Sequence, residues 1–337
     1  MRSTDLADEV ERLRQSDHGS PRPARDPVNQ PMIRNWVEAI GDHNPVYVDD
    51  DAARAAGFGG VVAPPAMTQS WTMPGLGADR ADDHPTVKLF DLLDSAGFTS
   101  IVATNADSVY HRYVGLGERL TLSTVLAEIV GPKQTALGEG WFCTLHNTWA
   151  VGDETVAEMD FRMLKFRPQS RSNPSRPTPP PRRPTTETGI SAGECTPNGT
   201  AADLPPLVEG AVFPQLRVHA TPTFIVSAAL ATRDFQEVHH DRDLAVARGS
   251  QDIFVNILTD TGLVQRYVSE CVGHRARFVA MDLRLGVPWY AYDTLTLAGR
   301  VVDVDGLRAS VSVTGTGALG QHIVATARLL LPGDPAP

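Results

Sequence analysis

Apolar and polar residues alternate over several long runs in each half of the chain. Such runs are RLTLSTVLAEIV and GWFCTLHNTWAV before residue 167, and DTLTLAGRVVDVD and HIVATARLLL after residue 205. Alternation with a period of two is typical of strands with one buried face. Each set of strands is preceded by an apolar segment of helical character, AMTQSWTM in the first half and NILTDTGLVQRYV in the second. We therefore expect each half to be an antiparallel sheet wrapped around one central helix.

A tract rich in Pro, Ser and Thr separates the two sets of strands. It covers residues 167–204, has no apolar periodicity, and is predicted to be a linker. The chain is thus divided into one domain at 28–166 and another at 205–334. Residues 1–27 are predicted to be an N-terminal tail, in which Leu6, Val10 and Leu13 have the spacing of a peripheral helix.

The two halves share one motif at a constant offset of 192 residues. In this pairing Asp42 corresponds to Asp234, and Gly57 corresponds to Gly249. The pairing also sets Tyr47 against His239, so the two copies differ at a residue that can carry chemistry.

The first copy of the motif reads GDHNPV and is followed by VVAPPAM, which resembles the MaoC-like, (R)-specific enoyl-CoA hydratases of hot-dog fold. In that family the motif is Gly-Asp-x-Asn-Pro-aliphatic-His, and its Asp and His act together on a water molecule. The second copy keeps this spacing at Asp234 and His239, although Arg233 replaces the Gly and Gln236-Glu237 replaces Asn-Pro. The resemblance implies an α+β double hot-dog, with two antiparallel sheets joined edge to edge, each wrapped around a central helix.

A closer likeness is to the actinobacterial two-subunit hydratases that act on steroid side-chain enoyl-CoA thioesters. Residues 28–166 resemble the non-catalytic subunit, a degenerate MaoC-like domain. Residues 205–334, with TRDFQEVHHD and RLGVPWYAYDT, resemble the catalytic subunit. The resemblance implies a fusion of the two subunits that works without a cofactor as a lyase of sterol side-chain degradation. Its substrate would be an acyl-CoA with a bulky acyl group, and its fused pseudo-dimers would pair into a homodimer.

Hydration of a conjugated enoyl thioester requires a base for the attacking water, an acid for the α-carbon and donors for the developing enolate oxygen. Asp234 and His239, which lie on one predicted loop, are the candidate acid/base pair. The candidate oxyanion donors are the backbone N–H groups of Asn256 and Ile257 at the start of the predicted central helix, where the helix dipole favours negative charge.

The first copy lacks both kinds of group. Tyr47 stands in the place of the histidine, and the two residues opposite the predicted donors are Pro64 and Pro65, which have no backbone N–H. Asp42, Asn44 and Tyr47 are therefore predicted to form a degenerate site, in which the Asp and the Asn order the loop. One working site in the second half is the expected arrangement.

Two other functions are compatible with the sequence. A hot-dog acyl-CoA thioesterase usually has its carboxylate on the central helix, where Asp252 and Asp260 are the candidates. A non-catalytic acyl-CoA-binding subunit would bind the thioester without converting it. Analysis of the product distinguishes these alternatives, because a thioesterase releases free CoA and a binding subunit forms no product.

Charge and composition exclude several other classes. With 30 Lys and Arg against 40 Asp and Glu, the net charge of −10 offers no broad basic surface, so nucleic acid is not an expected partner. No apolar run approaches the roughly 18 residues of a membrane span. The N-terminal segment is charged and lacks the features of a signal peptide, so we expect a cytoplasmic protein. The three cysteines are far apart, and we predict no metal site.

Overall fold

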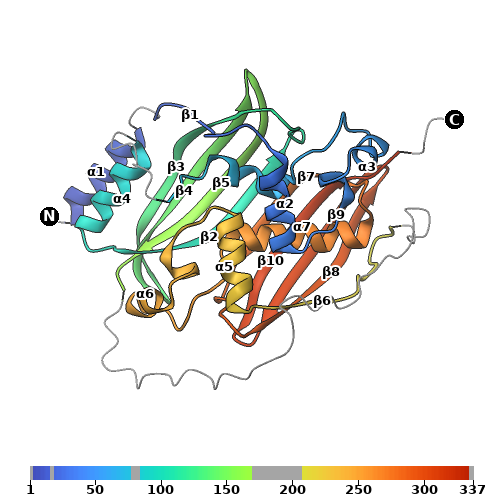
Figure 1. Ribbon diagram of the computed structural model, residues 1–337. Coiled ribbons are helices and arrows are strands. Elements are labelled where there is room, and N and C mark those ends of the chain that lie inside the picture. Colours follow the sequence, from blue (N-terminus) through green and yellow to red (C-terminus); the bar gives the residue numbers. More distant parts are fainter. Residues whose placement is uncertain (1–2, 16–18, 77–83, 169–206, 334–337) are drawn as a thin grey trace.

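The computed structural model describes residues 3–15, 19–76, 84–168 and 207–333 (Figure 1). All but the first two residues of the predicted linker, 167–204, lie outside these ranges.

The described strands form one antiparallel sheet in the order β1-β3-β4-β5-β2-β7-β10-β9-β8-β6. The first half contributes β1 (Arg22–Pro23), β2 (Ser100–Tyr110), β3 (Leu120–Thr135), β4 (Gly138–Val151) and β5 (Glu154–Phe166). The second half contributes β6 (Leu216–His219), β7 (Arg277–Leu285), β8 (Thr294–Asp305), β9 (Arg308–Gly317) and β10 (Gly320–Leu330). The halves join where β2 pairs with β7, and Asp107 opposite Asp282 is the middle pair of that ladder. The edge-to-edge double sheet predicted from the sequence is confirmed.

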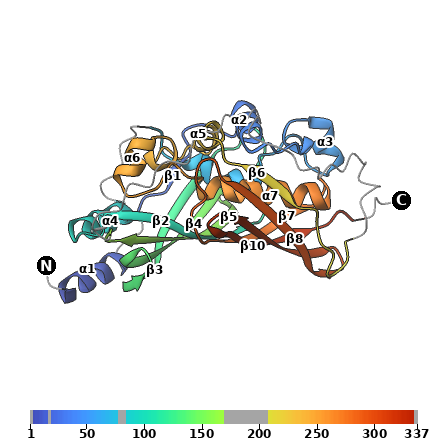
Figure 2. The ribbon, with the colours of Figure 1, turned by 90° about the horizontal axis from the view of Figure 1, so that it is seen from below.

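One helix of the second half, α7 (Ile257–Val272), forms the centre of the molecule. Every side chain from Ile257 to Ser269 is buried, so this helix is surrounded by protein on all sides. Figure 2 shows α7 against the sheet, with α2 (Gln30–Ile40) and α5 (Pro222–Ala231) in a further layer over it. The central helix predicted for the second half is thus present.

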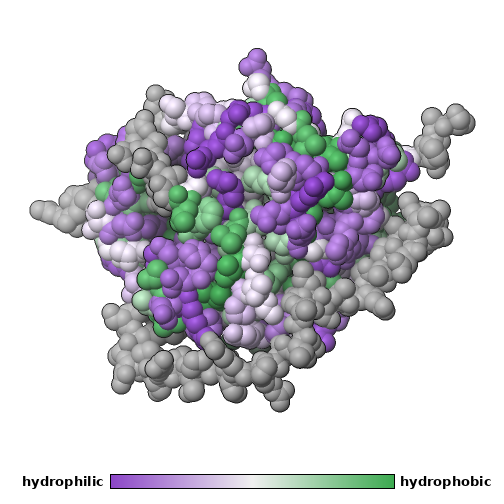
Figure 3. All heavy atoms as spheres, viewed as in Figure 1, coloured by the Kyte–Doolittle hydropathy of each residue, from purple (hydrophilic) through white to green (hydrophobic). Residues whose placement is uncertain are grey.

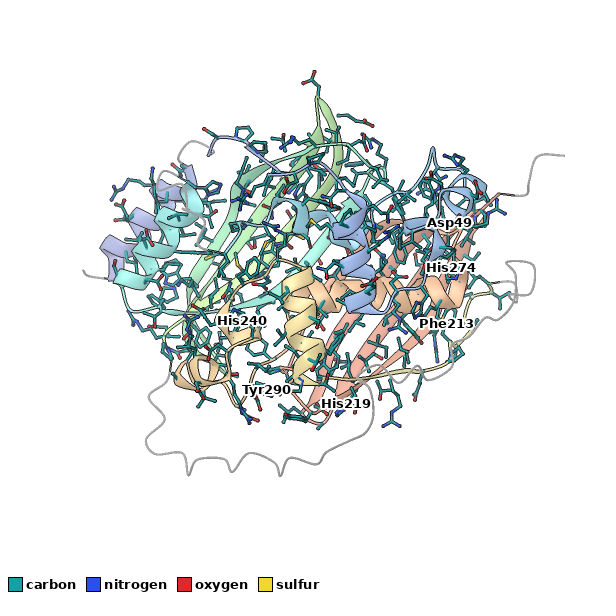
Figure 4. The ribbon with its side chains drawn as sticks, in the orientation of Figure 1. Asp49, Phe213, His219, His240, His274 and Tyr290 are labelled. Atoms are coloured by element: carbon teal, nitrogen blue, oxygen red, sulfur yellow. The ribbon has the colours of Figure 1, made fainter. Side chains whose placement is uncertain are left out.

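The repeated motif gives the same local structure in both halves. The first copy forms the short helices η1 (Pro45–Tyr47) and α3 (Asp50–Ala55), and the second forms η3 (Glu237–His239) and α6 (Arg242–Ala247). Asp49, labelled in Figure 4, accepts a hydrogen bond from the Ala52 N–H at 2.8 Å and caps α3; Asp241 caps α6 in the same way. Gly57 and Gly249 both have a positive φ, of 81° and 90°. The predicted repeat is confirmed.

The first half differs from the second in the segment after the motif. In place of a long central helix it has an eight-residue 3-10 helix, η2 (Pro65–Thr72). Proline bounds this segment on both sides, because Pro64 precedes it, Pro65 is its first residue, and Pro74 holds the backbone of Met73 extended. The prediction of a central helix in each half was therefore wrong in length and type for the first half.

Two further helices cover the outer end of the first half. They are α1 (Ser3–Gln15), within the predicted tail, and α4 (Pro85–Ser95). Leu6 and Val10 of α1 pack in a separate apolar cluster with Leu89 and Leu93 of α4 and with Trp141 of the sheet. The peripheral helix expected in the tail is present and has its own packing partners.

Candidate active site

Asp234 and His239 lie together at the start of α7. Asp234 follows the end of α5, and His239 is the last residue of η3. Both residues are 7% exposed, and the Asp234 Oδ2 lies 3.5 Å from the His239 Nε2. The two predicted acid/base residues are therefore close enough to contact a single water molecule. His240 and Tyr290 mark this region in Figure 4.

The backbone fixes the tautomer of His239. Its Nδ1 lies 2.8 Å from the carbonyl oxygen of Phe254, which can only accept a hydrogen bond. In the neutral imidazole Nδ1 therefore carries the proton, and the lone pair of Nε2 faces Asp234. The Phe254 ring packs edge-on against the imidazole, with ring centroids 4.8 Å apart. His239 is held in the orientation that a general base requires.

The Asn256 side chain connects Asp234 to the central helix. Its Nδ2 donates to the Asp234 Oδ2 at 3.2 Å and to the Thr232 Oγ1 at 2.9 Å. Its Oδ1 accepts from the Thr259 N–H at 2.8 Å and caps α7. The sequence analysis assigned only the backbone of Asn256. An Asn before an apolar helix is a recognisable helix cap. The sequence pattern does not reveal that the amide nitrogen of the same side chain donates to Asp234.

The first turn of α7 offers unpaired N–H groups. Within the described residues, the backbone N–H groups of Asn256 and Ile257 donate to no protein acceptor. Such groups at a helix start carry the positive end of the helix dipole and favour an anionic oxygen. At the matched positions of the first half, Pro64 and Pro65 have no N–H. The structure places both predicted donors beside the Asp–His pair.

A pocket extends from the start of α7 into the first half. Residues of η2, of three strands and of α7 line it: Pro65, Ala66, Thr68, Gln69, Ala106, Ser108, Tyr110, Trp149, Ala157, Glu158, Met159, Ile257, Leu258 and Thr261. Figure 3 shows hydrophobic residues exposed among hydrophilic ones near the centre of the face that it draws. The first half therefore provides most of the wall of this pocket.

The degenerate site of the first half is tied to the middle of α7. Tyr47 is 1% exposed, and its hydroxyl accepts from the Gln265 Nε2 at 3.1 Å. The Asn44 Nδ2 donates to the Ser269 Oγ at 3.2 Å, and the Asn44 N–H donates to the Asp42 Oδ1. Burial raises the pKa of Tyr47 well above its usual value, and burial also raises the pKa of Asp42 to about 6. These residues bind the other half of the molecule, as an ordering role requires.

Each thioesterase candidate is paired with a basic side chain and, like Asp234 and His239, is not among the residues that line this pocket. Asp252 precedes α7 and forms an ion pair with Arg242 at 2.8 Å. Asp260 is on α7 but is fully buried against His322 of β10. Within the described ranges no group of three or more His, Cys, Asp or Glu residues is arranged to hold a metal ion.

The fold and the site define a class: a double hot-dog protein in which one copy of the motif holds an Asp–His pair and the other an Asp with a Tyr. Residues 18–159 match the family model described as the FAS1-like, dehydratase domain region. Of the helices in the described ranges, none combines the length and apolar character needed to cross a membrane.

Two relatives from Mycobacterium tuberculosis match the chain. One is the 3-oxo-4,17-pregnadiene-20-carboxyl-CoA hydratase alpha subunit, 58% identical over 165 residues, or 49% of this chain and 53% of the relative. The other is the beta subunit of the same hydratase, 62% identical over 122 residues, or 36% of this chain and 95% of the relative. The chain thus spans about half the length of the alpha subunit. A solved MaoC-like dehydratase shares the fold, with a TM-score of 0.70 and 19% identity over 93% of this chain and 98% of that one.

The chain belongs to the family of the hydratase subunits that it matches, since it covers 95% of the beta subunit at 62% identity. Because it matches about half of the alpha subunit and nearly all of the beta subunit, it holds counterparts of both in one polypeptide, which confirms the predicted resemblance to a fusion.

Proposed function

We propose that this protein is a hydro-lyase that adds water to a 2-enoyl-CoA thioester with a bulky acyl group, and that Asp234 and His239 are its acid/base pair. The observation that carries the proposal is the 3.5 Å approach of the Asp234 Oδ2 to the His239 Nε2 at the start of α7. Asn256 and Ile257 offer N–H groups at the same place, and the first half lacks both features.

The chemistry follows from these positions. A water molecule held between Asp234 and His239 attacks the β-carbon, and the pair takes up one of its protons. Negative charge then develops on the thioester oxygen, where the N–H groups of Asn256 and Ile257 stabilise it. The pair returns one proton to the α-carbon, so the net change is the addition of one water molecule. No cofactor takes part in these steps.

We assign the bulky acyl group to the side of the site that the first half lines. Because η2 is a short 3-10 helix, the first half leaves space beside Ile257 that a long helix would fill. Its wall combines aromatic and aliphatic side chains with few charges, which suits a rigid hydrocarbon ring system. The names of the two mycobacterial relatives favour a steroid side-chain thioester as the substrate.

The domain roles follow from the same assignment. Residues 205–334 would be the catalytic domain, residues 28–166 the degenerate domain that holds the acyl group, and residues 167–204 the linker between them. The reaction would belong to steroid side-chain degradation in lipid metabolism, in the cytoplasm. The fused chains would pair into a homodimer, as a counterpart to the separate subunits that the names of the relatives describe.

Turnover by the purified chain tests the proposal. A steroid side-chain enoyl-CoA and a straight-chain enoyl-CoA are each incubated with the wild type and with His239→Ala, and enoyl absorbance and product mass are followed. We expect the steroid thioester to gain one water and the variant to lose about 10²- to 10⁴-fold in rate. Release of free CoA would instead indicate a thioesterase. Tight binding without turnover would indicate a binding subunit.

A further inference from the structure

A second acid–histidine pair lies inside the catalytic half, behind the site described above. The Asp260 Oδ2 is 3.1 Å from the His322 Nε2, and the side chains are 0% and 4% exposed. Asp260 belongs to the first turn of α7 and donates its N–H to the carbonyl of Asn256. His322 lies on β10. The pair therefore joins the start of the central helix to the sheet.

His322 also contacts the segment that supports the active-site loop. Its Nδ1 donates to the Val287 carbonyl at 2.6 Å. Two residues further along, the Trp289 carbonyl accepts from the Val255 N–H at 3.1 Å, and the Ala291 N–H donates to the Ile253 carbonyl at 3.0 Å. Phe254 lies between these two bonds, and its carbonyl orients His239. Both the helix start and the support of His239 thus depend on the position of His322.

The first half again serves as an internal control. At the offset of the repeat, Asp260 corresponds to Thr68. The Gly286 N–H donates to the His322 carbonyl as the His111 N–H donates to the Val156 carbonyl, so His322 corresponds to Val156. Neither Thr68 nor Val156 can form an ion pair. The half that lacks the acid/base histidine and the N–H donors also lacks both members of this pair.

Stability alone does not account for the pair. Removing two charges from water is costly, and apolar residues of similar volume often stabilise a core as well or better. The first half builds the same sheet with an apolar residue at the position of His322. The ion pair is therefore not a requirement of the fold.

We propose that Asp260 and His322 are positioning residues for the hydration, an inference that rests on the proposed function. They hold the first turn of α7 and the Phe254 carbonyl at a fixed distance. The N–H donors of Asn256 and Ile257 and the His239 imidazole, which act on opposite sides of the substrate, are thereby held at fixed positions relative to each other. Neither residue touches the substrate.

The charge state of His322 is consistent with this role. Burial acts to lower the pKa of His322, but attraction to Asp260, the Val287 hydrogen bond and the more distant Asp293 outweigh it, and the pKa is raised on balance. The pair is therefore an imidazolium with a carboxylate over a wider pH range than a free histidine would allow. Above that range His322 loses its positive charge, and the attraction between the two side chains is lost.

The test compares His322→Gln and Asp260→Asn with a matched control. Arg328, on the same strand β10 as His322, also pairs with a carboxylate, Asp282, and is 47% exposed, so Arg328→Gln removes an ion pair of that strand at the surface. Initial rates with the steroid thioester give kcat and KM, corrected for the folded fraction measured by circular dichroism. We expect kcat to fall about 10- to 100-fold in each pair variant with KM within about threefold, and to stay at the wild-type level in the control.

Each outcome decides the question. If His322→Gln folds and turns over at the wild-type kcat, the pair is structural and the positioning role is overturned. If that variant does not fold, Asp260→Asn, which keeps the size of the side chain, carries the same comparison. A wild-type protein with no hydratase activity would overturn the proposed function and the positioning role together, whereas an active wild type with equally active variants overturns the positioning role alone.

Discussion

Arg233 and Gly41 occupy the same place in the two copies, in the turn directly before the aspartate. Gly41 has a φ of 72°, and Arg233 adopts nearly the same value, 60°. A left-handed backbone is unfavourable for a residue with a Cβ, by about 1–2 kcal/mol. The loop before Asp234 thus keeps the shape of the glycine-containing loop despite its altered sequence, and it does so under strain.

Replacing Arg233 with Gly relieves this strain. We expect Arg233→Gly to raise the free energy of unfolding by roughly 0.5–1 kcal/mol, because the relief exceeds the entropic cost of a glycine. Urea denaturation followed by circular dichroism measures the change. Gly41→Ala is the converse substitution and should destabilise by about 1 kcal/mol. A destabilised Arg233→Gly would show that contacts of the Arg side chain outweigh the backbone strain.

The matched residues Tyr47 and His239 allow the same substitution at both sites. We expect Tyr47→Phe to lose the hydrogen bond from Gln265 and about 1 kcal/mol of stability, with kcat unchanged. His239→Phe should abolish hydration. Rate assays and thermal denaturation of both variants check this. Equal losses of activity would mean that the first site also takes part in the reaction.

At the scale of elements, α7 combines two tasks. Its first turn belongs to the active site, and its middle is bound by Asn44 and Tyr47 of the other half. Asn256 takes part in both, because its side chain caps the start of the helix and donates a hydrogen bond to Asp234. The helix therefore connects the buried core of both halves to the Asp234 carboxylate.

Removal of this cap should affect both stability and rate. We expect Asn256→Ala to cost about 1 kcal/mol of stability, as for other helix caps, and also to lower kcat because Asp234 loses its Nδ2 donor. Asn29 caps α2 by accepting from the Met32 N–H at 3.0 Å, and Asn29→Ala should lose similar stability with no change in kcat. If both variants kept the wild-type kcat, the Asn256–Asp234 contact would have no role in the reaction.

The elements also show what the sequence could and could not predict. The strands and α7 followed from periodicity, and the Asp234–His239 pair followed from a motif confined to a few residues of one loop. The short η2 was missed because an apolar run was read as a helix although Pro65 and Pro74 limit it. The Asp260–His322 pair could not be predicted, because only the folding of β10 onto α7 brings these residues together.

For the molecule as a whole, the two halves share one core that crosses their boundary. Asp42 of the first half is buried near Arg266 and Glu270 of α7, and burial raises its pKa to about 6 against 3.8 for a free side chain. The folded state therefore holds the Asp42 proton more tightly than the unfolded state does. This coupling makes the stability of the joined halves depend on pH.

The sign of this dependence can be measured. Because the folded pKa is raised, the contribution of Asp42 to stability is present below about pH 4 and is lost as the pH rises through about 6, by an amount of about 3 kcal/mol. Denaturation of the wild type and of Asp42→Asn between pH 4 and pH 8 should show that the variant lacks this loss. Asp51→Asn, at a side chain 98% exposed, should keep the wild-type profile. If the free energy of unfolding changed with pH in the same way in all three proteins, Asp42 would not be the source of the pH dependence.

The ladder between β2 and β7 joins two strands that would otherwise be open to other chains. At the ends of the ten-stranded sheet only β1, of two residues, and β6, of four, are left within the described ranges. Open edges are where sheets recruit further strands and begin to aggregate. β1 pairs with only Thr121 and Leu122 of β3, so within the described ranges most of the outer edge of β3 has no partner strand. The described part of the protein is therefore closed to strand addition where its two halves join, whereas the outer edge of β3 beyond Leu122 still has backbone groups that another strand could pair with.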